Sequence, residues 1–581
     1  MSTQTSNPAP TAPHFPEQVT GMYILAEALK RLSLDTVYGL VGIPVTEAAY
    51  AMQKVGVKFV GFRFEQQGGM AAATHGYLTK TPGVLLTVSS LGFMNGLTAT
   101  ANATVNCYPM IQISGASDPT MVDMNMGTYE QLDQFNTAKP LVKAAFRCSH
   151  AKDIPSAVAR AYRAAVSGRP GGVYIDMTTP ALAEIMNRED AEKLFYQPVD
   201  LYSPVAPNQA AVDRAVELLA SAKRPAILLG KGAAYAQVDD KIKKLIETYK
   251  IPYLPMSMAK GLMPDNGPMS ALSCRSDIME KSDVVMIIGA RLNWMLSFGR
   301  GKWNPAIKFI QLDVEPQEID VNVPISAPVV GDMGLSLDAI LAGLEGKAMQ
   351  ADPAWLASIQ AETKVKNAKF AERLKTVKSP MDHWTALSAV KPIIEANPDI
   401  ILINEGANTL DDTRDAIDMS LPRHRVDCAT WAIMGMGMGS TVGAAVATGK
   451  SVVAIEGDSA FGFSGMDFAT ICRFKLPVTV VIFNNGGIYN NVGVNPSTDP
   501  AIEHDPAPTT LDLAARYDKM GEVFGAANYY VKTPEELSKA LTEAIALKAP
   551  AIIDVQLAAD AGKESGHIGY LNPAPLIDYT V

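Results

Sequence analysis

Two short apolar runs in the last third of the chain, each followed by small, acidic or amide residues, constrain its fold most strongly. Residues 451–455 and 478–483 are rich in β-branched side chains and too short to span a membrane, so they predict buried strands. The sequence Gly-Asp-Ser (457–459) follows the first run, and Asn-Asn-Gly-Gly (484–487) follows the second after a helix-length gap. Neighbouring strands of a parallel sheet end at the same edge, where ligands bind. We therefore expect both polar segments to face one crevice.

The oxygen atoms of these two segments predict a site for a divalent cation. The Asp458 carboxylate, the Asn485 amide and the backbone carbonyl of Gly487 would form an incomplete oxygen shell. Mg²⁺ prefers oxygen ligands and commonly takes the remaining ones from phosphates. The pattern therefore implies a bound diphosphate, with Gly457 and Ser459 beside it. The alternative is an ordinary strand, turn and helix in which Asp458 caps the helix.

Length and composition limit the classes of protein that fit. A chain of 581 residues suggests about three domains, and 48% apolar with 19% charged residues is typical of a globular enzyme. The net charge of −10 argues against nonspecific binding to nucleic acid, and no apolar segment reaches the roughly 18 residues of a membrane helix. Five scattered cysteines, and a first segment without a basic or apolar run, predict a cytoplasmic protein with reduced thiols.

Alternating helical and strand patterns predict an α/β fold with three doubly wound parallel-sheet domains. Beyond the two runs above, strands are expected at 36–41, 59–63, 84–88, 110–113, 171–176, 225–229, 283–288, 308–312 and 551–555. The predicted divisions are a flexible tail at 1–19, a domain at 20–195, a second domain at 205–345, a helical linker at 346–380, a third domain at 381–560 and a polar tail at 561–581.

The paired polar segments resemble the diphosphate-binding motif of thiamine-diphosphate enzymes, which usually reads Gly-Asp-Gly and then Asn-Asn. Here Ser459 replaces the second glycine, and its hydroxyl can bond a phosphate oxygen. The resemblance covers nearly the whole chain. It implies thiamine diphosphate and Mg²⁺ as cofactors, and pyrimidine-binding, central Rossmann-like and diphosphate-binding domains in chain order. In that superfamily the cofactor lies between domains of different subunits, which implies a homodimer at least and commonly a homotetramer built as a dimer of dimers.

The same resemblance assigns roles to Glu65 and to the segment at 431–439. Glu65 follows an expected strand and begins an alanine-rich helix, and it would hydrogen-bond the pyrimidine ring and promote loss of the thiazolium proton. Met434 would bend the cofactor, and the Ala432 carbonyl would accept from its aminopyrimidine. Many relatives have glycine at 432, and alanine fits there if its φ is negative. The residue types alone also fit a glutamate at a helix start and a methionine-rich core helix.

Six strings resemble oxalyl-CoA decarboxylases in particular, at 38–44, 129–134, 404–408, 457–466, 484–489 and 564–568. In that family oxalyl-CoA loses CO₂ to give formyl-CoA in oxalate catabolism, so the expected activity is that of a carboxy-lyase. By this resemblance Tyr129 and Glu130 line the pocket and order a water, while Tyr489 and Ser565 lie nearest the reacting carbon. The tail that carries Ser565 is expected to fold over the substrate as a lid, the alternative being terminal disorder.

Two further sets of ligand contacts follow from that resemblance. Coenzyme A requires local partners on an acidic protein, and Asn408, Arg414 and His567 resemble the CoA-side positions of the family. Some relatives carry Arg where His567 stands. The central domain resembles an ADP-binding module, with ADP as activator or stabiliser. The expected ADP contacts are Arg169, Lys231, Arg291, Asp313 and Asp332.

Three other functions fit parts of the same pattern. A 2-hydroxyacyl-CoA lyase uses the same cofactor and CoA carrier but releases formyl-CoA and an aldehyde; Tyr129 and Glu130 favour the decarboxylase. A synthase of the acetohydroxyacid type lacks the CoA-associated tail. A noncatalytic nucleotide-binding protein of this fold would be expected to have lost Glu65 or Asp458, and both are present.

Overall fold

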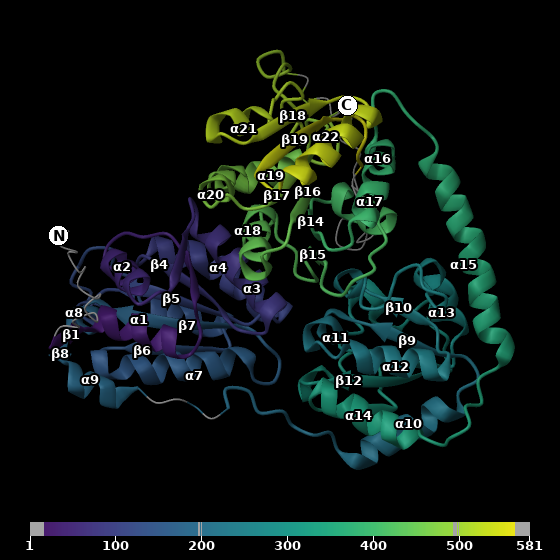
Figure 1. Cartoon of the computed structure of the whole chain (residues 1–581), viewed down its shortest axis with the longest axis horizontal. Coiled ribbons are helices and arrows are strands. Elements are labelled where there is room, and N and C mark those ends of the chain that lie inside the picture. Colours follow the sequence, from purple (N-terminus) through teal and green to yellow (C-terminus); the bar gives the residue numbers. More distant parts are fainter. Residues whose placement is uncertain are drawn as a thin grey trace, which may run out of the picture.

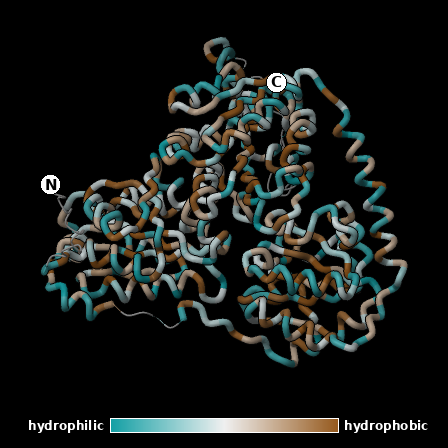
Figure 2. Tube along the Cα trace, in the orientation of Figure 1, coloured by the Kyte–Doolittle hydropathy of each residue, from teal (hydrophilic) through white to brown (hydrophobic). Residues whose placement is uncertain are grey.

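The computed structural model describes residues 17–195, 198, 200–491, 495, 497 and 499–563. Within these residues the chain forms three parallel β-sheets with helices on both faces, and one small antiparallel pair of strands (Figure 1). Apolar residues are concentrated along the strands and on the helix faces that cover them (Figure 2). The predicted α/β fold with three parallel-sheet domains is therefore confirmed.

The N-terminal domain, purple to blue in Figure 1, contains a six-stranded sheet in the order β3-β2-β4-β5-β7-β6. Its strands are β2 Thr36–Gly39, β3 Lys58–Gly61, β4 Gly83–Thr87, β5 Met110–Ala116, β6 Ala144–Cys148 and β7 Gly172–Thr178. One face is covered by α1 Gly21–Arg31, α2 Thr46–Lys54 and α7 Ile154–Val166. The other face is covered by α3 Glu65–Thr79 and α4 Leu91–Asn106.

The middle domain, teal in Figure 1, contains a five-stranded sheet in the order β10-β9-β11-β12-β13. Its strands are β9 Pro225–Leu229, β10 Tyr253–Pro255, β11 Val284–Ile288, β12 Lys308–Asp313 and β13 Ala327–Val330. One face packs against α10 Gln209–Ser221, α12 Asp239–Tyr249 and α14 Met333–Leu344. The opposite face packs against α13 Arg275–Lys281 and the first turns of α15 Pro353–Leu374, a long helix that continues toward the third domain (Figure 1).

The C-terminal domain, green to yellow in Figure 1, contains a six-stranded sheet in the order β15-β14-β16-β17-β19-β18. Its strands are β14 Ile401–Glu405, β15 Arg425–Asp427, β16 Val452–Gly457, β17 Val478–Asn484, β18 Ala527–Val531 and β19 Ala551–Gln556. One face is covered by α16 His383–Ala396 and α22 Pro534–Leu547. The other is covered by α18 Gly437–Thr448, α19 Asp458–Ser464 and α20 Phe468–Arg473. Numbered within their own domains, the first and third sheets share the strand order 2-1-3-4-6-5.

Helix α3 of the first domain and helix α18 of the third domain pack so closely that their backbones are in contact. A Cβ atom at Gly439 would lie 2.4 Å from the Gln67 carbonyl oxygen, and one at Gly443 would lie 2.4 Å from that of Ala71. These glycines are one helical turn apart on the same face of α18, so the two helices approach without intervening side chains. The apolar residues of both helices belong to one core that continues from the first sheet to the third.

Most strands predicted from apolar runs are confirmed, including 225–229 as β9 and 478–483 within β17. The edge strands β6 and β18 were not predicted, because most of their side chains are only partly buried and their sequences form no strong apolar run. Gln18 and Val19, which the prediction placed at the end of the N-terminal tail, lie in β1 Gln18–Thr20, which pairs antiparallel with β8 Ile185–Asn187. Among the described residues, no helix combines the length and apolar character that crossing a membrane requires.

Candidate active site

The carboxyl ends of β16 and β17 bring the predicted cation ligands together. The two strands are adjacent and parallel, with Gly457 in register with Phe483, so Asp458 and Asn485 follow at the same edge of the sheet. Asp458 is the first residue of α19 and is only 2% exposed, and Asn485 is 4% exposed. Sequence reasoning could find this pair because each residue directly follows a strong apolar run.

The Asp458 carboxylate is buried with one oxygen unpaired. Burial raises the pKa of Asp458 to about 6, while the backbone amides of Ser459, Gly486 and Gly487 oppose that rise. The Oδ2 atom has no hydrogen-bond partner. The Asn485 side chain donates its amide hydrogen to the Tyr489 carbonyl at 2.8 Å, which leaves its own carbonyl oxygen as the ligand atom. An unpaired carboxylate oxygen beside an amide oxygen fits Mg²⁺ with a diphosphate.

In the part of the chain that the structure describes, no three His, Cys, Asp or Glu side chains are grouped to hold a metal ion. The Asp458 edge offers one carboxylate, which suits a cation that completes its shell with phosphate oxygens.

Glu65 begins α3 at the carboxyl edge of the first sheet. Its side chain is 7% exposed, and its Oε2 atom accepts a hydrogen bond from Asn95 of α4 at 3.1 Å. A Cβ atom at Gly92 would lie 3.1 Å from Glu65 Oε1, so the first turn of α4 approaches the carboxylate closely. Helix α4 therefore restricts the orientation of this side chain, which suits the hydrogen bond to a ring nitrogen that the resemblance implies.

Glu130 lies beside the residues that lead into α4, and Tyr129 precedes it in the chain. Ser89, which follows β4, donates its hydroxyl to Glu130 Oε2 at 2.7 Å. Glu130 has a left-handed backbone with φ 49°, a conformation that costs energy for a residue with a side chain. Tyr129 is 67% exposed, and its hydrogen bond to Glu130 raises the pKa of its phenol. The side chains of Glu130 and Glu65 thus both contact the short segment at 89–95.

The segment at 431–436 is fixed by side chains of the first domain. Asn102 and Asn106 donate to the Trp431 carbonyl at 2.8 and 3.1 Å, and the Trp431 amide donates to Asn106 at 3.0 Å. Ala432 and Met434 are exposed between this attachment and α18. The Ala432 backbone does not adopt a left-handed conformation, so the condition for alanine at that position is met.

Two buried glutamates lie under the other end of this segment. Glu405 accepts hydrogen bonds from the backbone amides of Gly435 and Gly437, the latter at 2.5 Å. Burial raises the pKa of Glu405 to about 7 against the effect of these amides. Burial and the adjacent Glu405 raise the pKa of Glu456 well above its ordinary value. No hydrogen-bond donor reaches either of its carboxyl oxygens to oppose this rise.

The described part of the C-terminal tail passes between Asn408 and Tyr489. The Lys563 amide donates to Asn408 Oδ1 at 3.3 Å, and a Cβ atom at Gly562 would lie 1.8 Å from the Tyr489 carbonyl oxygen. The tail therefore reaches two residues that were predicted to contact substrate. Ser565 and His567, predicted from the same tail, lie outside the described residues.

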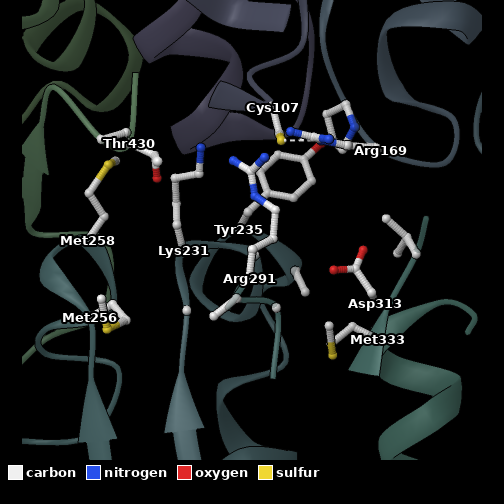
Figure 3. Close-up of a pocket in the computed structure, with 18 of the residues that line it drawn as sticks. Cys107, Arg169, Lys231, Tyr235, Met256, Met258, Arg291, Asp313, Met333 and Thr430 are labelled. Atoms are coloured by element: carbon white, nitrogen blue, oxygen red, sulfur yellow. Dashed lines mark hydrogen bonds between the residues drawn. The ribbon is translucent and has the colours of Figure 1, made fainter. Parts of the chain in front are cut away.

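A cavity of about 300 Å³ lies where the three domains meet. Its lining includes all five residues predicted to contact ADP, namely Arg169, Lys231, Arg291, Asp313 and Asp332. Lys231 and Arg291 extend from the middle domain toward Cys107 and Arg169 of the N-terminal domain (Figure 3). Arg414, predicted on the CoA side, also lines this cavity, whereas Asn408 at the start of its helix contacts the tail.

The cavity is strongly cationic on one side. Burial lowers the pKa of Lys231 to about 8, and its ammonium group lies 4.3 Å from the centre of the Tyr108 ring. Arg169 donates to Cys107 Sγ at 2.7 Å and also pairs with Glu318, which lies 3.5 Å from Arg291. Burial raises the pKa of Asp313 to about 6. Basic groups together with the acids Asp313, Glu318 and Asp332 in one cleft suit a ligand with phosphates and hydroxyl groups.

Comparison with protein families matches all three domains. Residues 19–137 match the N-terminal TPP-binding domain of thiamine pyrophosphate enzymes, residues 212–340 the central domain, and residues 410–555 the C-terminal TPP-binding domain. Oxalyl-CoA decarboxylase of Escherichia coli K12 is 50% identical over 557 residues, which cover 96% of this chain and 98% of that protein. The chain belongs to the family of this thiamine-dependent decarboxylase.

More distant relatives carry a different name. The 2-hydroxyacyl-CoA lyases of Arabidopsis thaliana and Homo sapiens are 39% and 35% identical, each over 96% of this chain and over 99% and 97% of their own lengths. The resemblance to oxalyl-CoA decarboxylases that the sequence strings indicated is therefore confirmed over the whole chain. As a member of the family, the protein is a thiamine pyrophosphate-dependent carboxy-lyase.

Several residues that complete these sites carried no recognisable signal in the sequence. Gln67 contacts α18, Asn95 contacts Glu65, and Glu318 pairs with two arginines of the cavity. Each contact joins segments that are distant in the sequence, so local spacing cannot indicate it. Glu405 lies within the string at 404–408, but the amides it binds come about thirty residues later.

We predict that Asp458→Asn will abolish stabilisation by thiamine diphosphate and Mg²⁺ without weakening the unliganded fold. Because the pKa of this carboxyl is raised to about 6 in the fold, its charge at pH 7 costs stability, and the amide removes that cost. In the wild-type chain, the cofactors at about 100 times their dissociation constant should add about 2.7 kcal/mol. Differential scanning fluorimetry with and without the cofactors measures both effects. An undiminished cofactor-dependent shift in the variant would exclude Asp458 as a ligand.

Proposed function

We propose that this protein catalyses the thiamine-diphosphate-dependent decarboxylation of oxalyl-CoA to formyl-CoA and CO₂, as a step of oxalate catabolism. The observation that carries this proposal is the 50% identity to an oxalyl-CoA decarboxylase over 96% of the chain. The 2-hydroxyacyl-CoA lyases compared with it are at most 39% identical. The unpaired cysteine thiols fit a reducing cytoplasm as the place of action.

The cofactor would be held at its two ends by residues of the two TPP-binding domains. Asp458, Asn485 and the Gly487 carbonyl would bind Mg²⁺, which with Gly457 and Ser459 would hold the diphosphate. Glu65 would hydrogen-bond the pyrimidine ring, the Ala432 carbonyl would accept from its amino group, and Met434 would contact its concave side. When bound, the cofactor supplies a carbon nucleophile and an electron sink for loss of CO₂.

The chain's own residues would orient the substrate and control proton transfer. Glu130, held by Ser89 at 2.7 Å, would order a water together with Tyr129 near the reacting carbon. Tyr489 and Ser565 would complete the polar contacts there. Asn408, Arg414 and His567 would contact coenzyme A. The tail beyond Lys563, which begins between Asn408 and Tyr489, would close over the substrate and exclude water.

The activity is tested with oxalyl-CoA and a 2-hydroxyacyl-CoA side by side, with thiamine diphosphate and Mg²⁺ present or removed. Formyl-CoA and CO₂ should form from oxalyl-CoA only with both cofactors. Glu65→Gln should lower kcat by about 100-fold or more, because the neutral amide cannot transfer the proton that a carboxyl group can. Chromatographic detection of formyl-CoA measures both. Aldehyde release from the hydroxyacyl substrate, with oxalyl-CoA untouched, would make the protein a lyase instead.

We further propose that two copies of the chain share each active site, in a homodimer that pairs into a homotetramer. Exposed apolar side chains surround the carboxyl edge of the first sheet, including Ile43, Leu91 and Met124, at 69%, 73% and 75% exposure. A second exposed apolar group, including Trp431 and Phe463, surrounds the carboxyl edge of the third sheet. Apolar surfaces of this kind at a functional edge are typical of an interface. A second copy would cover both at once.

Subunit mixing tests the shared site. Glu65→Gln and Asp458→Asn should each be inactive alone, yet co-expressed chains should recover about a quarter of wild-type activity. Random pairing makes half of the dimers mixed, and one of the two sites in each mixed dimer receives Glu65 from one chain and Asp458 from the other. The control is a chain that carries both substitutions, co-expressed with itself. If mixing restores nothing, the two groups act within one chain.

We propose ADP as the ligand of the three-domain cavity, where it would stabilise or activate the enzyme. Arg169, Lys231 and Arg291 would meet its phosphates, and the acids Asp313 and Asp332 would meet its hydroxyl groups. A thermal shift unchanged by saturating ADP would count strongly against this.

The proposed ADP contact has a defined pH dependence. Lys231 is charged below its pKa of about 8, so affinity for ADP should fall as pH rises beyond that value, by at most about tenfold per unit. Arginine stays charged, so Lys231→Arg should bind ADP with nearly constant affinity from about pH 7 to 9.5. Isothermal titration calorimetry at several pH values measures this. An equal fall in both proteins would assign the dependence to another group.

A further inference from the structure

The end of β14 and the start of α18 are joined by the carboxylate of Glu405. Glu405 is the last residue of β14, is 1% exposed, and accepts hydrogen bonds from the amides of Gly435 and Gly437 through its two oxygens. Both donors lie at the junction between the exposed Ala432–Met434 stretch and the first turn of α18. Hydrogen bonds from two amides to one buried carboxylate are charge-assisted and geometrically restrictive.

The surroundings leave this junction little freedom. Glu456 of β16 lies in register with Glu405, and a Cβ atom at Gly437 would come within 2.0 Å of Glu456 Oε1 and 2.8 Å of Glu405 Oε2. Gly437 has no left-handed backbone, so its lack of a side chain is required by the two acids and not by its φ. The backbone at Gly437 is therefore pressed directly against both carboxyl groups.

The first domain holds the same junction from the opposite side. Gln67, two residues after Glu65 in α3, donates to the Gly435 carbonyl and accepts from the Gly439 amide at 2.9 Å. Gly435 itself has φ 85°, and a Cβ atom there would lie 2.6 Å from the Phe463 side chain. The peptide groups on both sides of Gly435 thus have fixed partners: its amide binds Glu405 and its carbonyl binds Gln67.

We propose that Glu405 is a positioning residue for the cofactor: its carboxylate fixes the backbone at 435–437 and thereby sets where the Ala432 carbonyl and the Met434 side chain stand. This inference rests on the proposed cofactor site, because Ala432 and Met434 contact the cofactor only if it binds between the two TPP-binding domains. Glu405 itself would touch neither cofactor nor substrate. Glu405 would act only through the two backbone amides that it binds. Its loss should therefore weaken cofactor binding and lower kcat, but should not change affinity for the substrate.

The test compares Glu405→Ala, Glu405→Gln and the matched control Glu456→Gln. Glu456 is the register partner of Glu405 and equally buried, but no amide donates to it. Hydrogen exchange measured by mass spectrometry on the cofactor-free protein reports the 431–439 segment directly. Glu405→Ala should accelerate exchange there by about tenfold or more, because a charge-assisted hydrogen bond is lost. Glu405→Gln, which keeps one carbonyl acceptor, should change exchange less, and Glu456→Gln should leave it unchanged.

Cofactor titration and steady-state kinetics complete the test. Glu405→Ala should weaken binding of thiamine diphosphate by about tenfold or more and lower kcat, while KM for oxalyl-CoA stays within about twofold. Glu405→Gln should recover part of both losses. Two results would overturn the proposal. One is that hydrogen exchange at 431–439 is as slow in Glu405→Ala as in the wild type. The other is that exchange in this variant is accelerated equally throughout the third domain. Neither exchange nor cofactor affinity requires substrate, so both remain readable if oxalyl-CoA proves not to be decarboxylated.

Discussion

The backbone-distance contact between α3 and α18 is the interaction on which the rest of the structure depends. Gly439 and Gly443 admit the carbonyl groups of α3 to within van der Waals contact, and Gln67 adds hydrogen bonds across the same junction. Both helices begin at functional groups, α3 at Glu65 and α18 directly after the 431–436 segment. One contact therefore fixes Glu65 and the 431–436 segment of the same chain relative to each other, and in the proposed dimer these two groups would serve different cofactor sites. It also merges the apolar cores of the first and third domains, so separating them would expose a continuous core.

The third domain buries carboxyl oxygens without hydrogen-bond partners near the carboxyl edge of its sheet. Asp458 Oδ2 is unpaired, and both carboxyl oxygens of Glu456 lack a donor. An unpaired buried polar atom costs free energy in the unliganded protein, which a core evolved for stability alone would avoid. For Asp458 a bound cation would remove that cost, so metal affinity and fold stability are linked. Burying these unpaired carboxyl oxygens therefore lowers the stability of the unliganded protein at the edge of the sheet where the cofactor is expected.

The sequence predicts well those features that are local. The strands at 225–229 and 478–483, and the pairing of Asp458 with Asn485 at one edge, follow from apolar runs and the polar residues directly after them. Contacts between distant segments could not be predicted in this way. The hydrogen bonds of Gln67 to α18 depend on how two domains pack against each other, and the contact of Cys107 with Arg169 joins segments 62 residues apart within the first domain. The predicted ADP contacts came from family resemblance, and only the structure brings Arg169 of the first domain to the residues of the second.

The residues that line the cavity are followed directly in the chain by the 431–436 segment. Asp427, Ala429 and Thr430 line the cavity, and Trp431, the next residue, begins the segment that Asn102 and Asn106 hold. Arg425, at the base of the same stretch, is fully buried and donates to Asn404, the neighbour of Glu405. A cavity ligand that ordered residues 427–430 would therefore act on the backbone that leads to Met434. Such coupling would be reciprocal: cofactor binding would alter affinity for the cavity ligand by the same factor by which that ligand alters affinity for the cofactor.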